Sequence, residues 1–167
     1  MAALRPITLD EYADWQAATI PAYAAEKVAS GQWPEATSIE QSTKEYAELL
    51  PLGPATPDNH LFTILDSDPA AVGVLWFAVK TRFNARIAYV FDVSIRPKRQ
   101  RQGHALRAFQ ALDEEVRSLG LAGIALHVFG HNTAARALYD KLGFEATNIS
   151  LYKRVDAAPD DAETAAA

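Results

Sequence analysis

The residues with the clearest chemical potential form one loop, whose positions are Gln100, Arg101, Gln102, Gly103, His104 and Ala105. An apolar, strand-like run over residues 88–95 precedes this loop, and a helix-like run begins at Gly103. Main-chain N–H groups at a helix N-terminus bind phosphate, and glycine lets a ligand approach the backbone closely. We therefore expect an anion site here, although a plain strand-to-helix connection also has this pattern.

The charge around this loop favours an anion with several phosphates. No carboxylate occurs between Val93 and Leu112, whereas that stretch holds five cationic residues, Arg96, Lys98, Arg99, Arg101 and Arg107. A basic run of this kind is also typical of a solvated surface. The whole chain carries a formal net charge of −5, which argues against a nucleic-acid partner; salt-dependent oligonucleotide binding would be needed to support one.

A second group of polar residues lies further along the chain. In the run Leu126-His127-Val128 the two apolar residues share one face of a strand, so His127 points to the other face. Asn132 stands at the start of a helix that also carries Tyr139. Taken singly, these polar residues fit a core histidine, a helix cap and a packing aromatic.

The rest of the pattern predicts the elements that position both groups. Residues 3–7 indicate an edge strand, and Thr8 with Glu11 forms a capping box that starts a helix over residues 8–18. Pro21 interrupts or restarts a helical pattern that runs on to Gly31, and a second helix starts at Ser38. Strands are expected at residues 60–65, 71–79 and 86–95, followed by a helix over 103–119, a strand over 121–129, a helix capped by Asn132, and a final strand over 144–155.

Three strands in succession followed by a β-α-β step predict an α/β fold, with a mixed central sheet flanked by helices. Ligands of open sheets bind at the carboxyl ends of parallel strands, where the loop after residue 95 lies. We expect one domain over residues 1–155 and a disordered, acidic and alanine-rich tail over residues 156–167.

Composition narrows the protein class. The 167 residues are 49% hydrophobic and include no cysteine, which excludes disulfides, thiol catalysis and cysteine metal sites. The four histidines lack metal-binding spacing, so no metal is expected. No apolar run is long enough to span a membrane and no signal peptide is evident, so we expect a cytoplasmic protein without a membrane partner.

Together the two groups resemble the GNAT superfamily of acyl-CoA-dependent N-acetyltransferases over residues 71–153. The resemblance rests on Val93-x-Ile95-x-Pro97, on Q-x-x-G-x-A, and on N-x-x-A-x-x-L-Y-x-x-x-G-F, which begins at Asn132. Ala105 stands where many members have glycine. The resemblance implies a single GNAT-like domain that transfers an acetyl group from acetyl-CoA to a primary amine by direct attack. A non-catalytic acyl-CoA-binding regulatory module is the alternative, and a homodimer is compatible with the family.

The resemblance also assigns roles to residues of this chain. Backbone groups of residues 93–95 would pair with the pantetheine arm, and the amides of residues 101–105 would hold the pyrophosphate of coenzyme A. The cofactor-binding residues expected on this basis are Val93, Ser94, Ile95, Gln100, Arg101, Gln102, Gly103, His104, Ala105, Asn132, Ala135 and Tyr139.

Tyr139 would be the general acid that protonates the departing thiolate. For the general base we favour His127, which stands where the ribosomal-protein alanine acetyltransferase branch has glutamate in L-E-V-x-x-x-N; Asp92 is the main competitor. The acceptor, a small cationic amine or a protein or peptide amino group, would contact Tyr23, Glu26, Trp33 and His60.

Overall fold

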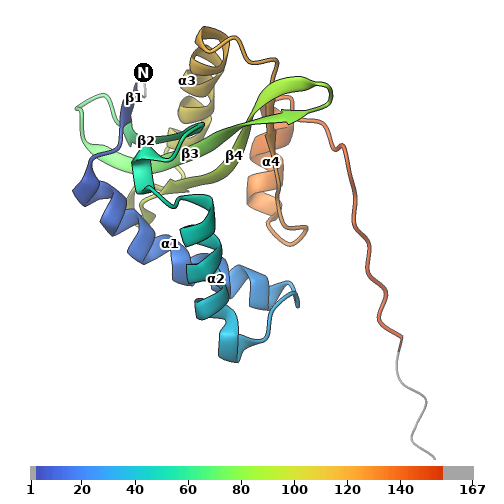
Figure 1. Ribbon diagram of the computed structural model, residues 1–167. Helices are drawn as coiled ribbons and strands as arrows, with labels where there is room; N and C mark the ends of the chain where they lie inside the picture. The colour runs from blue at the N-terminus through green and yellow to red at the C-terminus, as the bar shows by residue number, and fades with distance from the viewer. Residues whose placement is uncertain (1–2, 156–167) are drawn as a thin grey trace, which may run out of the picture.

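The computed structural model describes residues 3–155, which form one α/β domain around a five-stranded sheet (Figure 1). The strands are β1 (Ala3–Pro6), β2 (Asn59–Leu65), β3 (Ala71–Arg82), β4 (Ala85–Ile95) and β5 (Ile124–Leu126), in that spatial order. The first four are antiparallel neighbours, and β5 runs parallel to β4. This arrangement confirms the predicted mixed sheet. The tail expected at residues 156–167 lies outside the described residues.

Helices lie on both faces of the sheet. They are α1 (Leu9–Ala29), α2 (Glu35–Leu49), α3 (His104–Ser118) and α4 (Thr133–Lys141), with short 3-10 turns at Gly53–Ala55 and Pro97–Arg99. Figure 1 shows α1 and α2 together on one side, while α3 and α4 belong to the other side. Because α3 links β4 to β5, these two strands are parallel.

The two faces of the sheet carry separate cores. Side chains alternate along β3, so Leu75 and Phe77 join the core beneath α3, whereas Trp76 joins the core beneath α1 and α2. The α1–α2 core is aromatic: the rings of Trp15 and Tyr46 lie with their centroids 5.7 and 5.8 Å from that of Trp76. This aromatic core supports the side of the sheet on which the cavity described below opens.

A β-bulge in β4 changes which side chains face α1. Trp76 pairs with Asp92 but Phe77 pairs with Val90, so Phe91 is an extra residue in β4. Phe91 stacks on Trp76 at a centroid distance of 4.4 Å. The next residue also faces α1, because the carboxylate of Asp92 accepts a hydrogen bond of 2.7 Å from Trp15 Nε1. The bulge thus brings two successive side chains of β4 to one face.

Several boundaries differ from the predictions for the N-terminal half. Helix α1 is continuous through Pro21, because both of its halves pack on the rest of the domain through buried Trp15 and Ala24. Helix α2 begins at Glu35 instead of Ser38; the hydroxyl of Ser38 is buried and donates to the carbonyl of Glu35. The capping box at the start of α1 forms as predicted.

The C-terminal predictions need two corrections. Strand β5 covers only Ile124–Leu126 and not residues 121–129, because β4 pairs with it only over Ala88, Tyr89 and Val90. The strand predicted over residues 144–155 is absent: this segment has no regular secondary structure and no neighbouring strand among the described residues. Strand formation needs a partner for the main-chain N–H and C=O groups, and the described chain provides none.

Glu11 connects three elements, and its replacement tests their stability. Its carboxylate contacts Arg5 of β1 at 2.7 Å and Thr63 of β2 at 2.7 Å, and it caps α1 at Thr8. These hydrogen bonds, that of Arg5 foremost, lower the pKa of Glu11 to about 2. A lowered carboxyl pKa stabilises the fold above the unfolded-state value, and this stabilisation is lost as the pH falls through the folded-state value.

Glu11→Gln should therefore reduce the free energy of unfolding at pH 7 by about 1–3 kcal/mol. Urea unfolding at several pH values measures this difference, which should shrink between about pH 5 and pH 2. Glu114→Gln is the control, because its ion pair with Arg117 is mostly exposed and should contribute under about 1 kcal/mol. A Glu11→Gln difference that does not depend on pH would contradict the assignment.

Candidate active site

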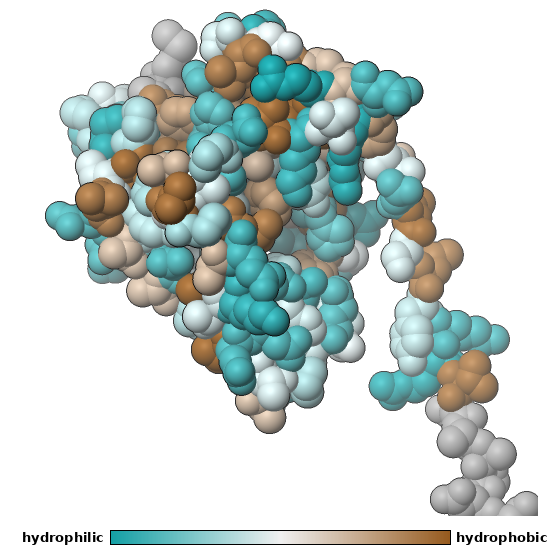
Figure 2. All heavy atoms as spheres, in the orientation of Figure 1, coloured by the Kyte–Doolittle hydropathy of each residue, from teal (hydrophilic) through white to brown (hydrophobic). Residues whose placement is uncertain are grey.

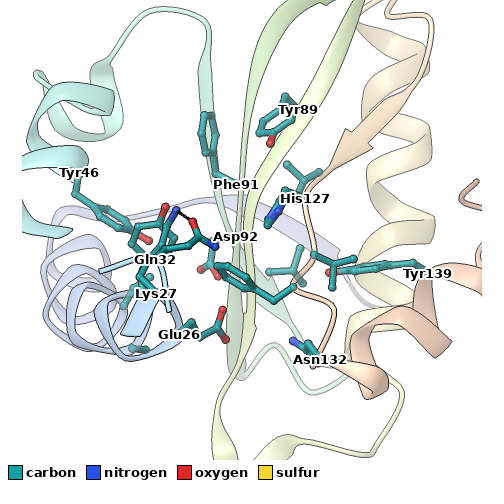
Figure 3. A pocket seen from close by; sticks show the side chains of 17 residues that line it. Glu26, Lys27, Gln32, Tyr46, Tyr89, Phe91, Asp92, His127, Asn132 and Tyr139 are labelled. Atoms are coloured by element: carbon teal, nitrogen blue, oxygen red, sulfur yellow. Dashed lines mark hydrogen bonds between the residues drawn. The ribbon is translucent and has the colours of Figure 1, made fainter. Parts of the chain in front are cut away.

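A cavity of about 430 Å³ opens between α1, β4 and the segment that leads from β5 into α4 (Figure 3). Its lining residues are Thr19, Ala22, Tyr23, Glu26, Lys27, Gln32, Tyr46, Tyr89, Val90, Phe91, Asp92, Val93, His127, Val128, Phe129, Asn132 and Tyr139. All three residues predicted to be catalytic, Asp92, His127 and Tyr139, are therefore brought together at one cavity. They come from β4, from the segment after β5, and from α4.

The sheet opens at this cavity because β4 and β5 separate. Their pairing ends at Val90 with Leu126, so residues 91–95 of β4 have a strand neighbour only on the β3 side within the described chain. Val93 lies at the cavity, whereas Ser94 and Ile95 continue the strand toward the loop at residues 100–105. An extended ligand can form hydrogen bonds with the main-chain groups of this free edge, as an added β-strand would.

Asp92 occupies a partly buried position in the cavity wall. Burial raises the pKa of this carboxyl group; the hydrogen bond from Trp15 opposes the shift and the charge of Glu26 adds to it. Figure 3 shows the Asp92 carboxylate on the side of β4 that faces Glu26 of α1. Two carboxylates thus face the same space, which favours a cationic group there.

Tyr139 lies on α4, with its ring held by the core under α3. The ring makes edge contacts with Phe109 and Phe144 at centroid distances of 5.6 and 5.5 Å. Burial raises the pKa of the Tyr139 hydroxyl, and the negative charges of Asp92 and Glu26 raise it further. The hydroxyl therefore keeps its proton at neutral pH and is able to donate it.

His127 and Asn132 line the cavity from the segment that leads from β5 into α4. His127 is exposed, and its ring makes an edge contact with Phe129 at 5.1 Å. Asn132 caps α4, since its Oδ1 accepts a hydrogen bond of 3.1 Å from the amide of Ala135. The side-chain NH2 of Asn132 stays available to the cavity, and Ala135 itself does not line it.

The residues predicted for the acceptor divide into two groups. Tyr23 and Glu26 line the cavity, and Trp33 supports it from behind with its ring edge-on to Tyr23 at 5.6 Å. His60 does not lie at the cavity. Its ring stacks on Phe77 at 4.7 Å, on the face of the sheet that α3 covers.

The loop predicted to bind phosphate lies beyond the end of β4 and forms no part of this cavity. Gly103 has φ 77° and Arg101 has φ 62°, so the backbone turns sharply into α3. Side chains hold the loop: Gln102 Nε2 donates to the carbonyl of Lys98, and Arg107 donates to the carbonyl of Gln102. Among the described residues no acceptor is found for the amides of residues 101–105, as an anion-binding loop requires.

Buried His104 links this loop to the turn between β2 and β3. The imidazole Nδ1 lies 2.9 Å from a guanidinium nitrogen of Arg107, which can only donate, so Nδ1 accepts. The other ring nitrogen lies 3.9 Å from the Asp66 carboxylate, which is 3.7 Å from Arg99. The His104 imidazole thus positions cationic side chains around the loop and presents no ring atom to a ligand.

The close approach at Gly103 gives a test of the loop. A Cβ added there would meet Arg107 Nη1 at 3.0 Å, whereas one added at Gly120, which has φ 64°, would meet nothing within 4 Å. Gly103→Ala and Gly120→Ala should each cost about 1 kcal/mol of stability through their positive φ. Only Gly103→Ala should also raise the coenzyme A dissociation constant, by about tenfold, in calorimetric titration; equal affinities in the two variants would contradict the loop assignment.

Sequence reasoning missed several residues at the cavity. Lys27 lies over the rings of Tyr23 and Trp33, each 5.3 Å away, and 6.0 Å from that of Phe129. Phe129 could have been found from the sequence, because it follows His127 by two residues and would share its face in the strand predicted over residues 121–129. Phe91 gave no such signal, because its orientation depends on the bulge.

With this geometry established, comparisons with known proteins assign the chain to a class. The model of the acetyltransferase (GNAT) family matches residues 18–144. The uncharacterized N-acetyltransferase YycN of Bacillus subtilis (strain 168) is 32% identical over 152 residues, which are 91% of this chain and 97% of that protein. The crystal structure of YycN has a TM-score of 0.89 and 31% identity, covering 94% of this chain and 100% of that chain.

Two further proteins are similar over less of the sequence or only in fold. The [ribosomal protein bS18]-alanine N-acetyltransferase of Escherichia coli (strain K12) is 37% identical over 62 residues, which are 37% of this chain and 42% of that protein. The structure of AAC(6')-Iy in complex with the bisubstrate analogue CoA-S-monomethyl-acetylneamine has a TM-score of 0.57 and 15% identity, covering 94% of this chain and 99% of that chain. The second likeness is one of fold alone.

This chain belongs to the GNAT family of acetyltransferases. The family, the fold class and the enzyme class, an acyltransferase, are therefore as predicted from the sequence. No helix among the described residues is both long and apolar enough to cross a membrane.

Proposed function

We propose that this protein transfers an acetyl group from acetyl-CoA to the primary amine of a small cationic acceptor or of a peptide. The observation that carries the proposal is the cavity at the free edge of β4, where Asp92, His127 and Tyr139 converge. The free edge suits the pantetheine arm, and the loop at residues 101–105 suits the pyrophosphate. AAC(6')-Iy, which shares the fold, binds an analogue built on coenzyme A.

The chain's residues fit each step of a direct transfer. An alkylammonium must lose a proton before it attacks, and His127 is the base that we assign to this step. The amine nitrogen then bonds to the thioester carbon, and a main-chain N–H of residues 93–95 stabilises the oxyanion. When the C–S bond breaks, the sulfur takes the electron pair and receives a proton from Tyr139, whose raised pKa keeps it protonated. The nitrogen loses its surplus proton to water as the amide forms, and Tyr139 regains a proton from water.

The acceptor side of the cavity favours a cation. The carboxylates of Glu26 and Asp92 line the space that the acceptor would enter, and carboxylates attract ammonium groups. The aromatic rings at the cavity already contact cations of the chain, since Lys80 lies 4.7 Å from the Tyr89 ring and 4.5 Å from the Phe91 ring. The cation of Lys27 is held against aromatic rings and by a hydrogen bond of 2.9 Å to Gln32, so it does not neutralise these carboxylates directly.

Release of free thiol from acetyl-CoA tests this function. The chain has no cysteine, so the thiol signal comes from coenzyme A alone. The assay should cover polyamines, aminoglycosides, amino acids and peptides with a free N-terminus. Release that depends on one cationic amine is the expected result. If no amine causes thiol release but acetyl-CoA raises the melting temperature, the non-catalytic binding module would be supported instead.

A further inference from the structure

The outer part of the β3–β4 hairpin carries two cations that the acetyl transfer described above does not use. Side chains alternate along β3, so Lys80 and Arg82 lie on the same face of the sheet as Trp76. Figure 1 shows that this part of the hairpin projects beyond α1 and α2. Both cations are exposed, and Figure 2 shows hydrophilic side chains gathered over this part of the molecule. A ligand is therefore able to reach them.

Aromatic rings of the cavity wall hold these two cations in place. The Lys80 ammonium lies 4.7 Å from the centroid of the Tyr89 ring and 4.5 Å from that of the Phe91 ring. The Arg82 guanidinium lies 4.9 Å from the centroid of the same Tyr89 ring. Because Tyr89 and Phe91 both line the cavity, the two cations lie at its rim.

Lys80 and Arg82 have no anionic partner in the part of the chain that the structure describes. The ion pairs found within residues 3–155 include neither side chain. Desolvation lowers the pKa of the Lys80 ammonium, and the nearby charge of Arg82 lowers it further, so the two cations repel each other. An anion bound to both would offset this repulsion. The pair is therefore suited to hold a carboxylate.

Groups of the opposite charge lie further along the same cavity. Figure 3 shows Tyr89 and Glu26 toward opposite ends of the cavity, with the carboxylate of Asp92 between them. Tyr89 precedes Asp92 by three residues of β4, which corresponds to about 10 Å along a strand. A ligand that spans the cavity thus meets carboxylates at one end and cations at the other.

We propose that the acceptor is a peptide whose N-terminal amine lies beside Asp92 and Glu26 and whose carboxylate, about three residues further along, binds Lys80 and Arg82. This inference rests on the proposed function and narrows its acceptor to one class. An extended peptide covers about 3.3 Å per residue, so an aspartate or glutamate at the third or fourth position reaches the cations. A free α-amino acid is too short to contact both ends, and a polyamine offers no anion.

Peptides that differ in a single residue test this assignment. Four-residue peptide amides with a free N-terminus carry glutamate, glutamine or lysine at the third position, and thiol release from acetyl-CoA gives kcat/KM for each. The wild type should favour glutamate over glutamine by about fivefold to tenfold and should disfavour lysine, with the difference in KM. Equal values of kcat/KM for the glutamate and glutamine peptides would overturn the proposal.

Neutral and reversed side chains locate the preference on the hairpin. Lys80→Gln/Arg82→Gln should abolish the preference for glutamate, and Lys80→Glu/Arg82→Glu should favour the lysine peptide. Arg86→Gln is the matched control: Arg86 is also an exposed cation of this hairpin, but it pairs with Thr81 and lies on the opposite face of the sheet. This variant should keep the preference. If the preference for glutamate survives Lys80→Gln/Arg82→Gln, the two cations do not bind the acceptor.

Binding of the same peptides separates a failure of this proposal from a failure of acetyl transfer. Fluorescence anisotropy of peptides labelled at the C-terminus measures their affinity for the protein saturated with coenzyme A, without any transfer. Tighter binding of the glutamate peptide to an inactive protein would contradict the transfer and support the anion site. Acetylation without a preference for glutamate would contradict the anion site alone. Peptides that neither bind nor react would overturn the anion site as well.

Discussion

Replacing Tyr139 by phenylalanine should lower kcat by about 100-fold or more, because the departing thiolate loses its proton donor. The affinity for acetyl-CoA should stay within about twofold, since the phenyl ring keeps the contacts with Phe109 and Phe144. The melting temperature should likewise be close to that of the wild type. Steady-state thiol release measures kcat, and calorimetric titration with coenzyme A measures the affinity separately.

A second tyrosine serves as the control for this variant. Tyr12 lies on α1 beside Trp15 and does not line the cavity, so Tyr12→Phe should leave kcat unchanged. Because burial raises the pKa of Tyr139, loss of its proton should not lower the wild-type rate at neutral or mildly alkaline pH. If Tyr139→Phe retained the wild-type kcat, Tyr139 would not be the proton donor for the departing thiolate.

Replacing His127 by alanine should lower kcat/KM for the amine by about 100-fold, because the ammonium would no longer have a base to receive its proton. Added imidazole should restore part of the rate. His127 is exposed, so the substitution should not change the stability of the fold.

Asp92→Asn separates the two candidates for the base. The amide oxygen of asparagine is able to accept the hydrogen bond from Trp15, so the substitution removes the charge while keeping the contact. With His127 as the base, Asp92→Asn should cost less than tenfold in kcat/KM. A larger loss in Asp92→Asn, together with an unchanged pH profile in His127→Ala, would assign the base to Asp92.

The sequence was sufficient to predict the parts of the fold that rest on local patterns. The capping box of Thr8 and Glu11, the meander of β2, β3 and β4, and the cap of α4 by Asn132 all depend on residues close together in the chain. The loop around Gly103 and the position of Tyr139 were likewise recognisable from spacing. These features also carry the resemblance to the GNAT family.

Features that depend on tertiary pairing were not predictable. The bulge at Phe91 is set by the pairing of β4 with β3, and it decides that Phe91 and Asp92 face α1 together. Helix α1 continues through Pro21 because packing outweighs the local cost of proline. The strand predicted over residues 144–155 has the right pattern and no partner strand within residues 3–155, a difference that no local rule detects.

Transfer of a labelled acetyl group is the most direct test of the central claim. The protein would be incubated with acetyl-CoA carrying 13C in its acetyl group and with the amine that releases most thiol, and the products followed by NMR. The account predicts a 13C-acetamide on the amine, formed in equal amount to the coenzyme A released, and its loss in Tyr139→Phe. Thiol release without any acetamide would contradict the account, because it would show hydrolysis of acetyl-CoA instead of transfer to an amine.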